Sequence, residues 1–230
     1  MSKQIAKLRQ EVQKGERERR GSRRAHGVKK IADLLVFLIG PPHSGKSEFL
    51  QRWTGVEGRK GMGIADVGGM KVQVVELPSV VPGVKGRSQP VMPDAVIVFV
   101  TKDFPDAESL VACYGPYMLK IPRVVVSSEV PGNASLKSAP VVGQVEKALV
   151  EGLDVKRIYL KSPQQKEPDK KPMIFRGEVT VGDVATLIHK SLAENFKYAR
   201  VWGSVNYQGE KVGKSYKLSD GDIVEIHRSR

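Results

Sequence analysis

The sequence predicts an α/β protein with two domains: a shortened domain with a mostly parallel sheet, then a small β-grasp domain. A phosphate-loop motif lies between a strand-like apolar run and a helical pattern. Strand and helix patterns then alternate as far as residue 152, which is typical of a parallel sheet covered by helices. Residues 155–230 show short strands around one helix. We therefore predict a basic N-terminal helix or linker at 1–30 and domains at 31–154 and 155–230.

The first of these features is the octet G-P-P-H-S-G-K-S, which fits the pattern G-x-x-x-x-G-K-S/T without a mismatch. Its glycines let backbone N–H groups turn around a phosphate, its lysine adds a positive charge, and its final hydroxyl reaches a magnesium ion. A helix starting near Gly45 supplies further donors. The predicted nucleotide-binding residues are Gly40, Pro41, Pro42, His43, Ser44, Gly45, Lys46 and Ser47. The alternative is a loop that keeps this shape but holds no nucleotide.

The formal net charge of +13 is concentrated at the two ends of the chain. Residues 1–30 hold eleven Lys and Arg against three Glu, residues 31–154 hold twelve against thirteen acids, and residues 155–230 hold fifteen against nine. Basic ends favour a polyanionic partner, most simply RNA, through salt-sensitive phosphate contacts. The alternative is that the basic ends are only solvated.

The N-terminal segment has Ile5, Leu8 and Val12 at helical spacing, followed by a dense basic run over 14–24. Three apolar positions form a thin stripe that cannot fold alone, so we expect a short helix and a basic linker. The single cysteine, Cys113, allows no internal disulfide. Because no apolar run reaches the length of a membrane span, we expect a cytoplasmic protein with no membrane partner.

The elements of the first domain follow from local patterns. Predicted strands cover 34–39, 71–77, 94–101 and 121–127, and predicted helices follow the phosphate loop up to Thr54-Gly55, begin after Asp106, and run from Pro140 to Gly152. Residues 56–70 hold five glycines and are predicted to be a flexible loop. Four strands are few for a nucleotide-binding domain, so the domain is predicted to be trimmed.

A carboxylate, Glu76, ends the second predicted strand. In phosphate-loop proteins an acid at this place holds magnesium, directly or through water. Ser47 and Glu76 are therefore the predicted magnesium ligands. The equal alternative for Glu76 is a strand-end carboxylate facing solvent.

In the second domain, strands are predicted at 157–160, 173–175, 198–202 and 222–227, with a polar, proline-rich loop at 162–172. Thr180 and Asp183 have the spacing of a capping box. Val184, Leu187, Ile188 and Leu192 follow at the spacing of one helix face. Tyr198 and Trp202 lie at alternate strand positions and are predicted to face the core; base stacking is the alternative.

These segments resemble the developmentally regulated GTP-binding proteins of archaea and eukaryotes, which are Obg-like GTPases with a C-terminal TGS domain. Residues 188–204 and 211–214 resemble the TGS domain, 27–47 resembles the approach to the phosphate loop, and 69–83 resembles the third nucleotide motif. The resemblance implies a shortened, degenerate member: a truncated P-loop GTPase-like domain with a mostly parallel sheet, followed by a β-grasp, ubiquitin-like TGS domain.

The departures from this family concern nucleotide selection and hydrolysis. The third motif has Glu76 and Ser79 where the family has Asp-x-x-Gly, and Val80 supplies no group to position water. No threonine between Gly55 and Gly69 matches the first switch, and 127–130 reads S-S-E-V where Asn-Lys-x-Asp would read guanine. The family's inserted domain is also absent. His43 is interpreted as a loop-surface residue, and no catalytic residue is predicted.

The expected function is that of a degenerate GTP-binding-protein homologue that associates with RNA or the ribosome. Its cofactor would be GTP or another nucleoside triphosphate with Mg²⁺. A translation factor or a DFRP-like protein is a further expected partner. Two alternatives are a slow P-loop GTPase or NTPase of the Obg-like class involved in translation, and a structural adaptor with an inherited loop.

Overall fold

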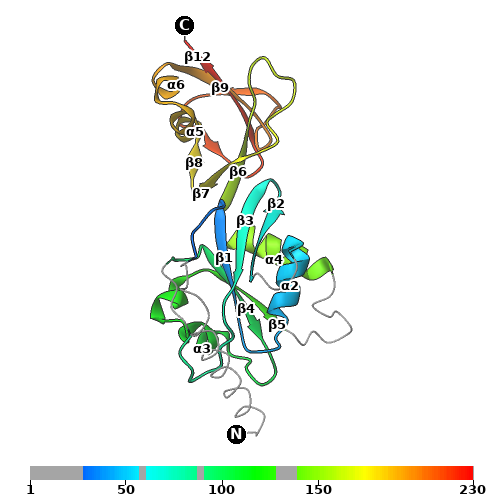
Figure 1. Cartoon of the computed structure of the whole chain (residues 1–230). Coiled ribbons are helices and arrows are strands. Elements are labelled where there is room, and N and C mark those ends of the chain that lie inside the picture. Colours follow the sequence, from blue (N-terminus) through cyan, green and yellow to red (C-terminus); the bar gives the residue numbers. More distant parts are fainter. Residues whose placement is uncertain (1–27, 57–60, 87–90, 128–138, 230) are drawn as a thin grey trace. The chain divides into compact units, whose positions relative to one another are not determined.

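The computed structural model describes residues 28–56, 61–86, 91–127 and 139–229. The chain divides into two compact units, Met1–Val67 with Lys71–Gly152 and Gly68–Met70 with Leu153–Arg230 (Figure 1). None of the helices found in these ranges has the length and apolar character needed to cross a membrane. Residues 1–27 of the helix or linker predicted at 1–30, and residues 128–130 of the S-S-E-V segment, lie outside the described residues.

The first unit is built on a five-stranded sheet of order β2-β3-β1-β4-β5. Its strands are β1 (Leu34–Ile39), β2 (Met62–Val67), β3 (Met70–Glu76), β4 (Ala95–Val100) and β5 (Arg123–Ser127). The neighbours β3, β1, β4 and β5 are all parallel. Every residue of β1 and β4 is buried, as central strands covered on both faces must be. The predicted α/β class with a mostly parallel sheet is confirmed.

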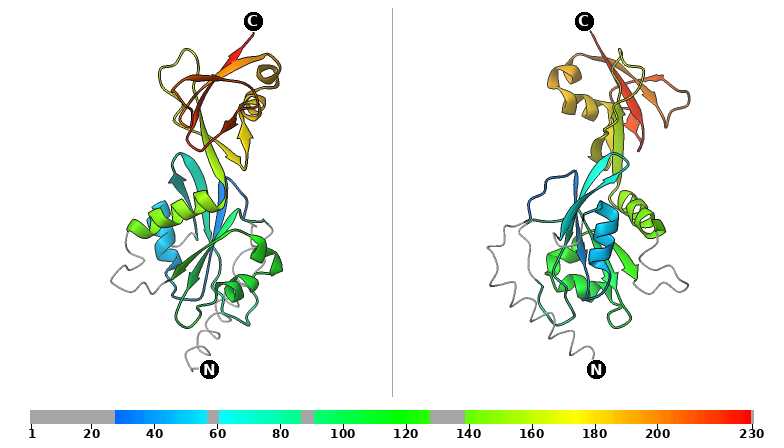
Figure 2. Two further views of the ribbon diagram at one scale, coloured as in Figure 1. Left: turned by 180° about the vertical axis from the view of Figure 1, so that it is seen from behind. Right: turned by 45° about the vertical axis from the view of Figure 1, so that its right-hand side comes forward.

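Helices cover both faces of this sheet, with α2 (Lys46–Thr54) and α4 (Ala139–Gly152) on one face and α3 (Ala107–Ala112) on the other (Figures 1 and 2). Asp106 caps α3 as predicted, since its side chain accepts from the Glu108 N–H. A 3₁₀ helix, η1 (Pro116–Lys120), then leads into β5. Alternate β1 residues, Leu35, Phe37 and Ile39, pack against the α3 side of the sheet.

The prediction of a loop over 56–70 is wrong, because residues 62–67 form β2 at the edge of the sheet. Its residues alternate between exposed and buried, with Gly63, Ala65 and Val67 on the buried side. A Cβ on Gly63 would lie 2.3 Å from Thr54 Oγ1 at the end of α2. Gly63 therefore allows β2 and α2 to pack closely. The number of glycines in the segment predicted a flexible loop instead.

The second unit has a five-stranded sheet of order β10-β9-β12-β6-β7 and a separate pair β11-β8. The strands are β6 (Val155–Leu160), β7 (Met173–Arg176), β8 (Val179–Thr180), β9 (Phe196–Trp202), β10 (Glu210–Val212), β11 (Lys217–Leu218) and β12 (Ile223–Arg228). In the five-stranded sheet β12 and β6 are parallel, and the other three pairs are antiparallel. This arrangement around one main helix is the β-grasp fold, as predicted.

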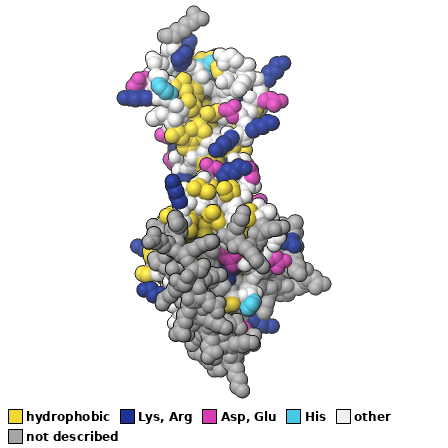
Figure 3. All heavy atoms as spheres, viewed as in Figure 1, with side chains coloured by type: hydrophobic (Ala, Val, Ile, Leu, Met, Phe, Trp, Pro, Cys, Tyr) yellow, Lys and Arg dark blue, Asp and Glu magenta, His cyan; other side chains and the backbone are white. Residues whose placement is uncertain are grey.

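The helical segment of this unit is broken, which corrects the single face predicted for residues 184–192. Helix α5 (Val181–Ile188) ends at His189, which then caps α6 (Lys190–Glu194) by accepting from the Ser191 N–H. Val181, Val184 and Ala185 are buried, but Leu187 and Ile188 are exposed. Figure 3 shows hydrophobic side chains gathered over α5 in the second unit. Because of the break, Leu192 lies on α6 and does not share with Val184 the helix face that the 3.6-residue periodicity had predicted.

The prediction that Tyr198 and Trp202 face the core is also wrong. On β9 the buried residues are Ala199 and Val201, which belong to the hydrophobic core of the second unit. Tyr198 and Trp202 lie on the opposite face and are half-buried. The strand does alternate, as predicted, but the buried residues are the small ones. Large aromatic residues are more often expected in a core than Ala and Val, so the wrong face was predicted to be buried.

The predicted capping box at the start of α5 is present and carries a first testable prediction. The Thr180 hydroxyl accepts from the Asp183 N–H, and the Asp183 carboxylate accepts from the Thr180 N–H at 2.8 Å. Thr180→Ala should therefore destabilise the second unit by about 1 kcal/mol. Thr186→Ala on the same helix is the control, because its hydroxyl bonds only a carbonyl within the helix and its loss should change little. Urea unfolding in a Trp53→Phe background, followed through the fluorescence of Trp202, measures both; equal effects would contradict the capping argument.

Candidate phosphate-binding loop

The loop between β1 and α2 has three residues with positive φ, a conformation that glycine adopts easily and other residues rarely adopt. Gly40 has φ 153°, His43 has φ 59° and Gly45 has φ 87°. A Cβ on Gly40 would lie 2.6 Å from the carbonyl oxygen of Phe99 in β4. Gly45 is the N-cap of α2 and offers no side chain to the first N–H groups of the helix. Those N–H groups have no partner within the helix, so they are donors for an anion.

Lys46 is the most buried charged residue of the loop, with 3% of its surface exposed. Its Nζ donates to Pro41 O at 2.7 Å and to Gly40 O at 3.1 Å. It also donates to the hydroxyls of Ser44, at 3.3 Å, and of Ser79, at 3.1 Å. The loop therefore wraps around the ammonium group and fixes its position.

Of the other predicted loop residues, Gly40, Pro41 and Ser44 are buried, Pro42 and Gly45 are half-buried, and His43 and Ser47 are exposed. The Ser44 hydroxyl donates to Pro41 O at 2.9 Å, so it closes the loop internally. Residues 40–45 thus form a closed loop, and Lys46 and Ser47 begin α2.

Ser47 and Glu76 meet although they lie 29 residues apart: the Ser47 hydroxyl donates to Glu76 Oε1 at 2.9 Å. The parallel pairing of β1 with β3 places Leu38 beside Glu76, and the Leu77 N–H donates to Leu38 O at 3.0 Å. The strand-end carboxylate is therefore held at the start of α2. Two oxygen ligands side by side suit Mg²⁺ bound to phosphate oxygens and water. Among the described residues, no group of three or more His, Cys, Asp and Glu side chains could hold a metal by itself.

Ser79 is the residue of this site that sequence reasoning did not assign. It accepts from Lys46 Nζ, and the next residue, Val80, donates its N–H to Gly40 O at 3.2 Å. Val80 is 1% exposed, so its side chain belongs to the core. The segment after β3 therefore closes against the loop through a hydroxyl and a backbone bond. Its position three residues after Glu76, where the third nucleotide motif ends, could have identified it as a site residue.

Burial lowers the pKa of Lys46 to about 8, although the negative charge of Glu76 acts in the opposite direction. A phosphate requires the charged lysine, so nucleotide affinity should be constant between pH 7 and 7.5 and fall above pH 8, by up to about tenfold per pH unit. Calorimetric titration between pH 7 and 9.5 measures this. Lys46→Arg is the matched control, because arginine keeps its charge and should remove the decline. A decline of the same size in that variant would assign it to another group.

The comparisons with known proteins match the second unit to a family and the chain to a set of relatives. The family model of the TGS domain matches residues 156–228. An uncharacterized GTP-binding protein of Methanocaldococcus jannaschii is 45% identical over 84 residues, covering 36% of this chain and 21% of that protein. Developmentally-regulated G-protein 3 of Arabidopsis thaliana is 43% identical over 79 residues, covering 33% and 21%.

A further relative is developmentally-regulated GTP-binding protein 2 of Homo sapiens, 37% identical over 70 residues, with 30% of this chain and 19% of that protein covered. Among solved structures, a GTP binding protein from Pyrococcus horikoshii OT3 covers 85% of this chain and 100% of its own, with 12% identity and a TM-score of 0.46. The matched part of the chain thus spans about a fifth of the length of these curated relatives. The second unit is a TGS domain, and the resemblance of the chain to the developmentally regulated GTP-binding proteins is confirmed.

Proposed function

We propose that this protein is a GTP-binding-protein homologue that associates with RNA or the ribosome and holds a nucleoside triphosphate with Mg²⁺ in the loop 40–47. The observation that carries the nucleotide part is the geometry around Lys46. A buried ammonium, the start of α2 and the pair Ser47 and Glu76 meet at the carboxyl ends of β1 and β3. Together they match the charges of a triphosphate and its metal ion.

In this proposal each residue has a separate task. Lys46 neutralises phosphate oxygens, and the backbone N–H groups at the start of α2 orient them. Ser47 and Glu76 would hold Mg²⁺, which neutralises phosphate charge when bound. The GTP-binding proteins among the relatives support the same ligand class.

We further propose that the groups that select and cleave the nucleotide are lost. The position next to Ser79 carries Val80, whose side chain is buried and apolar, so it cannot orient an attacking water. Ser79 itself is engaged with Lys46. The proposal therefore predicts nucleotide binding with little discrimination between bases and little turnover.

The RNA part of the proposal is supported by charge. Residues 155–230 carry fifteen Lys and Arg against nine acids, and residues 1–30 carry eleven against three. Such an excess binds polyanions through counterion release, so affinity should fall steeply with added salt. A translation factor or a DFRP-like protein remains the proposed protein partner.

The test combines nucleotide and RNA measurements on the full chain. Calorimetry with non-hydrolysable GTP and ATP analogues should show affinities within about tenfold of each other, both weakened by EDTA. Glu76→Gln should remove the effect of Mg²⁺ but leave the binding measured in EDTA. Brisk GTP hydrolysis with clear rejection of ATP would overturn the proposed loss of catalysis, and absence of all binding would overturn the nucleotide site.

The RNA part is tested by cosedimentation with ribosomes and by RNA titration at several salt concentrations. We expect the logarithm of affinity to fall linearly with the logarithm of salt concentration. Deleting residues 1–24 should make this slope shallower. Binding that is insensitive to salt would contradict the proposal.

A further inference from the structure

The open face of the TGS sheet carries a group of aromatic and basic side chains that the core does not use. We call it the β9 face. It is formed by Lys161 after β6, Tyr198, Arg200 and Trp202 on β9, Lys211 on β10, and Glu225 and His227 on β12. The strand register aligns these residues, since Arg200 pairs with both Lys211 and Glu225, and Tyr198 pairs with His227. They therefore lie on one continuous surface, opposite Ala199 and Val201.

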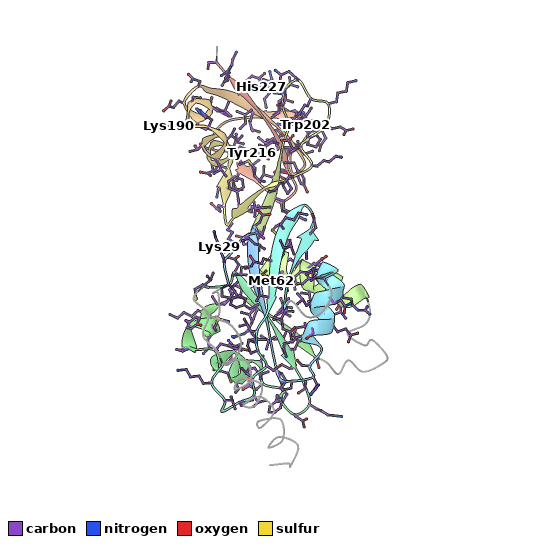
Figure 4. All side chains as sticks on the ribbon, in the orientation of Figure 1. Lys29, Met62, Lys190, Trp202, Tyr216 and His227 are labelled. Atoms are coloured by element: carbon purple, nitrogen blue, oxygen red, sulfur yellow. The ribbon has the colours of Figure 1, made fainter. Side chains whose placement is uncertain are left out.

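The rings on this surface are arranged as platforms. Tyr198 and His227 stack with centroids 4.4 Å apart and an interplanar angle of 16°. Trp202 lies four residues further along β9, about 13 Å away at the usual strand rise. Figure 4 labels Trp202 and His227 on the second unit. Both residues are half-buried, so the rings are supported by the sheet and retain exposed surface.

Each platform has a cation beside it. Lys161 Nζ lies 4.3 Å from the centroid of the Trp202 ring, and Lys211 Nζ lies 5.0 Å from that of Tyr198. Such contacts orient the ammonium groups at the ring faces. A base that replaces the ammonium group on either ring would leave that lysine beside the phosphate of the same nucleotide.

The charge of the face is positive. Its one carboxylate, Glu225, is 7% exposed and is already engaged by His227 Nε2 at 2.7 Å and Lys161 Nζ at 3.4 Å. Between the two platforms, Arg200 Nε is buried and has no hydrogen-bond partner among the described residues. This nitrogen is shielded from solvent, so it is not itself a ligand contact, but the guanidinium adds positive charge between the two platforms. The face therefore complements an anion that also has flat apolar rings.

We propose that the β9 face binds single-stranded RNA, with bases stacked on Tyr198 and Trp202 and phosphates contacted by Lys161, Arg200 and Lys211. This inference rests on the proposed RNA association and names the surface responsible. Unpaired RNA fits better than a duplex, because bases must leave the helix to stack on protein rings. It fits better than an acidic peptide, because such a peptide supplies charge but few flat rings.

The test uses the full chain and a fluorescently labelled 12-nucleotide oligouridylate. Tyr198→Ala and Trp202→Ala should each weaken binding about tenfold, and Trp202→Phe should restore most of the affinity because a ring is retained. Tyr207→Ala is the matched control, since Tyr207 is an aromatic residue of the same unit that is 64% exposed and outside the face. Lys211→Gln, on an exposed side chain, should make the salt dependence shallower without a risk to folding.

The outcomes separate this inference from the proposed function. If the wild type binds RNA and all four face variants bind equally well, the β9 face is not the site, although RNA association stands. If the wild type binds no RNA, both fail. If duplex RNA or polyglutamate competes as well as oligouridylate, the partner is another polyanion and the inference is overturned.

Discussion

Lys46→Met is expected to abolish measurable nucleotide binding while leaving the first unit at least as stable as in the wild type. The methionine keeps most of the side-chain volume but removes the charge that is proposed to neutralise the phosphates. Loss of several charge-assisted hydrogen bonds should weaken binding on the order of a hundredfold. Calorimetry with a non-hydrolysable nucleotide measures this effect.

The unchanged or higher stability is expected because burial of the Lys46 charge destabilises the folded state. Its pKa falls from 10.5 to about 8 on burial, which corresponds to a cost of about 3 kcal/mol for holding the charge in the folded state at neutral pH. Since the folded pKa lies below the unfolded one, this cost is full below pH 8 and disappears as pH rises to about 10.5. Methionine removes it at every pH.

Little opposes that gain, because the carbonyls that Lys46 contacts keep other donors. Gly40 O still accepts from the Val80 N–H, and Pro41 O still accepts from the Ser44 hydroxyl. The melting temperature of Lys46→Met at pH 7 should therefore equal or exceed that of the wild type. Lys85→Met, at an exposed lysine of the same unit, is the control and should change neither property. Wild-type nucleotide affinity in Lys46→Met would show that the loop is not the binding site.

Gly40→Ala is expected to destabilise the first unit by about 3 kcal/mol and to weaken nucleotide binding as well. Its Cβ would lie 2.6 Å from the carbonyl oxygen of Phe99 and 2.9 Å from the Phe99 Cβ, and its φ of 153° is strained for alanine. Phe99 is fully buried in a central strand, so neither side can move without disturbing the core. The start of the phosphate loop would shift with it.

A second glycine separates the steric effect from the backbone effect. Gly55 has φ 69° at the end of α2, but a Cβ there would meet nothing within 4 Å. Gly55→Ala should therefore cost only about 1 kcal/mol. Urea unfolding in a Trp202→Phe background, read through Trp53 on α2, reports on the first unit. Equal costs at the two glycines would contradict the role given to the contact with Phe99.

Local chemistry explains which elements could be predicted. The Thr180 cap, the Asp106 cap and the Gly55 end of α2 all depend on residues within one helical turn, and all are present. The edge strand β2 was not predicted because its small residues are required by the close contact with α2, where Gly63 packs against Thr54, and this contact is not visible in the sequence. The break at His189 was not predicted because the apolar spacing continues to Leu192. The cap that His189 provides for α6 is not visible in that spacing.

The sequence by itself determined the phosphate loop, since the spacing of Gly40, Gly45 and Lys46 specifies a turn whose backbone and charge suit an anion. The pairing of Ser47 with Glu76 as magnesium ligands was also predicted, but only the tertiary structure set their distance and joined Ser79 to Lys46, because parallel strand pairing brings these segments together. It also decided that Tyr198 and Trp202 turn away from the core. Alternation tells which residues of a strand share a face, but only the packing of the rest of the domain decides which face is covered.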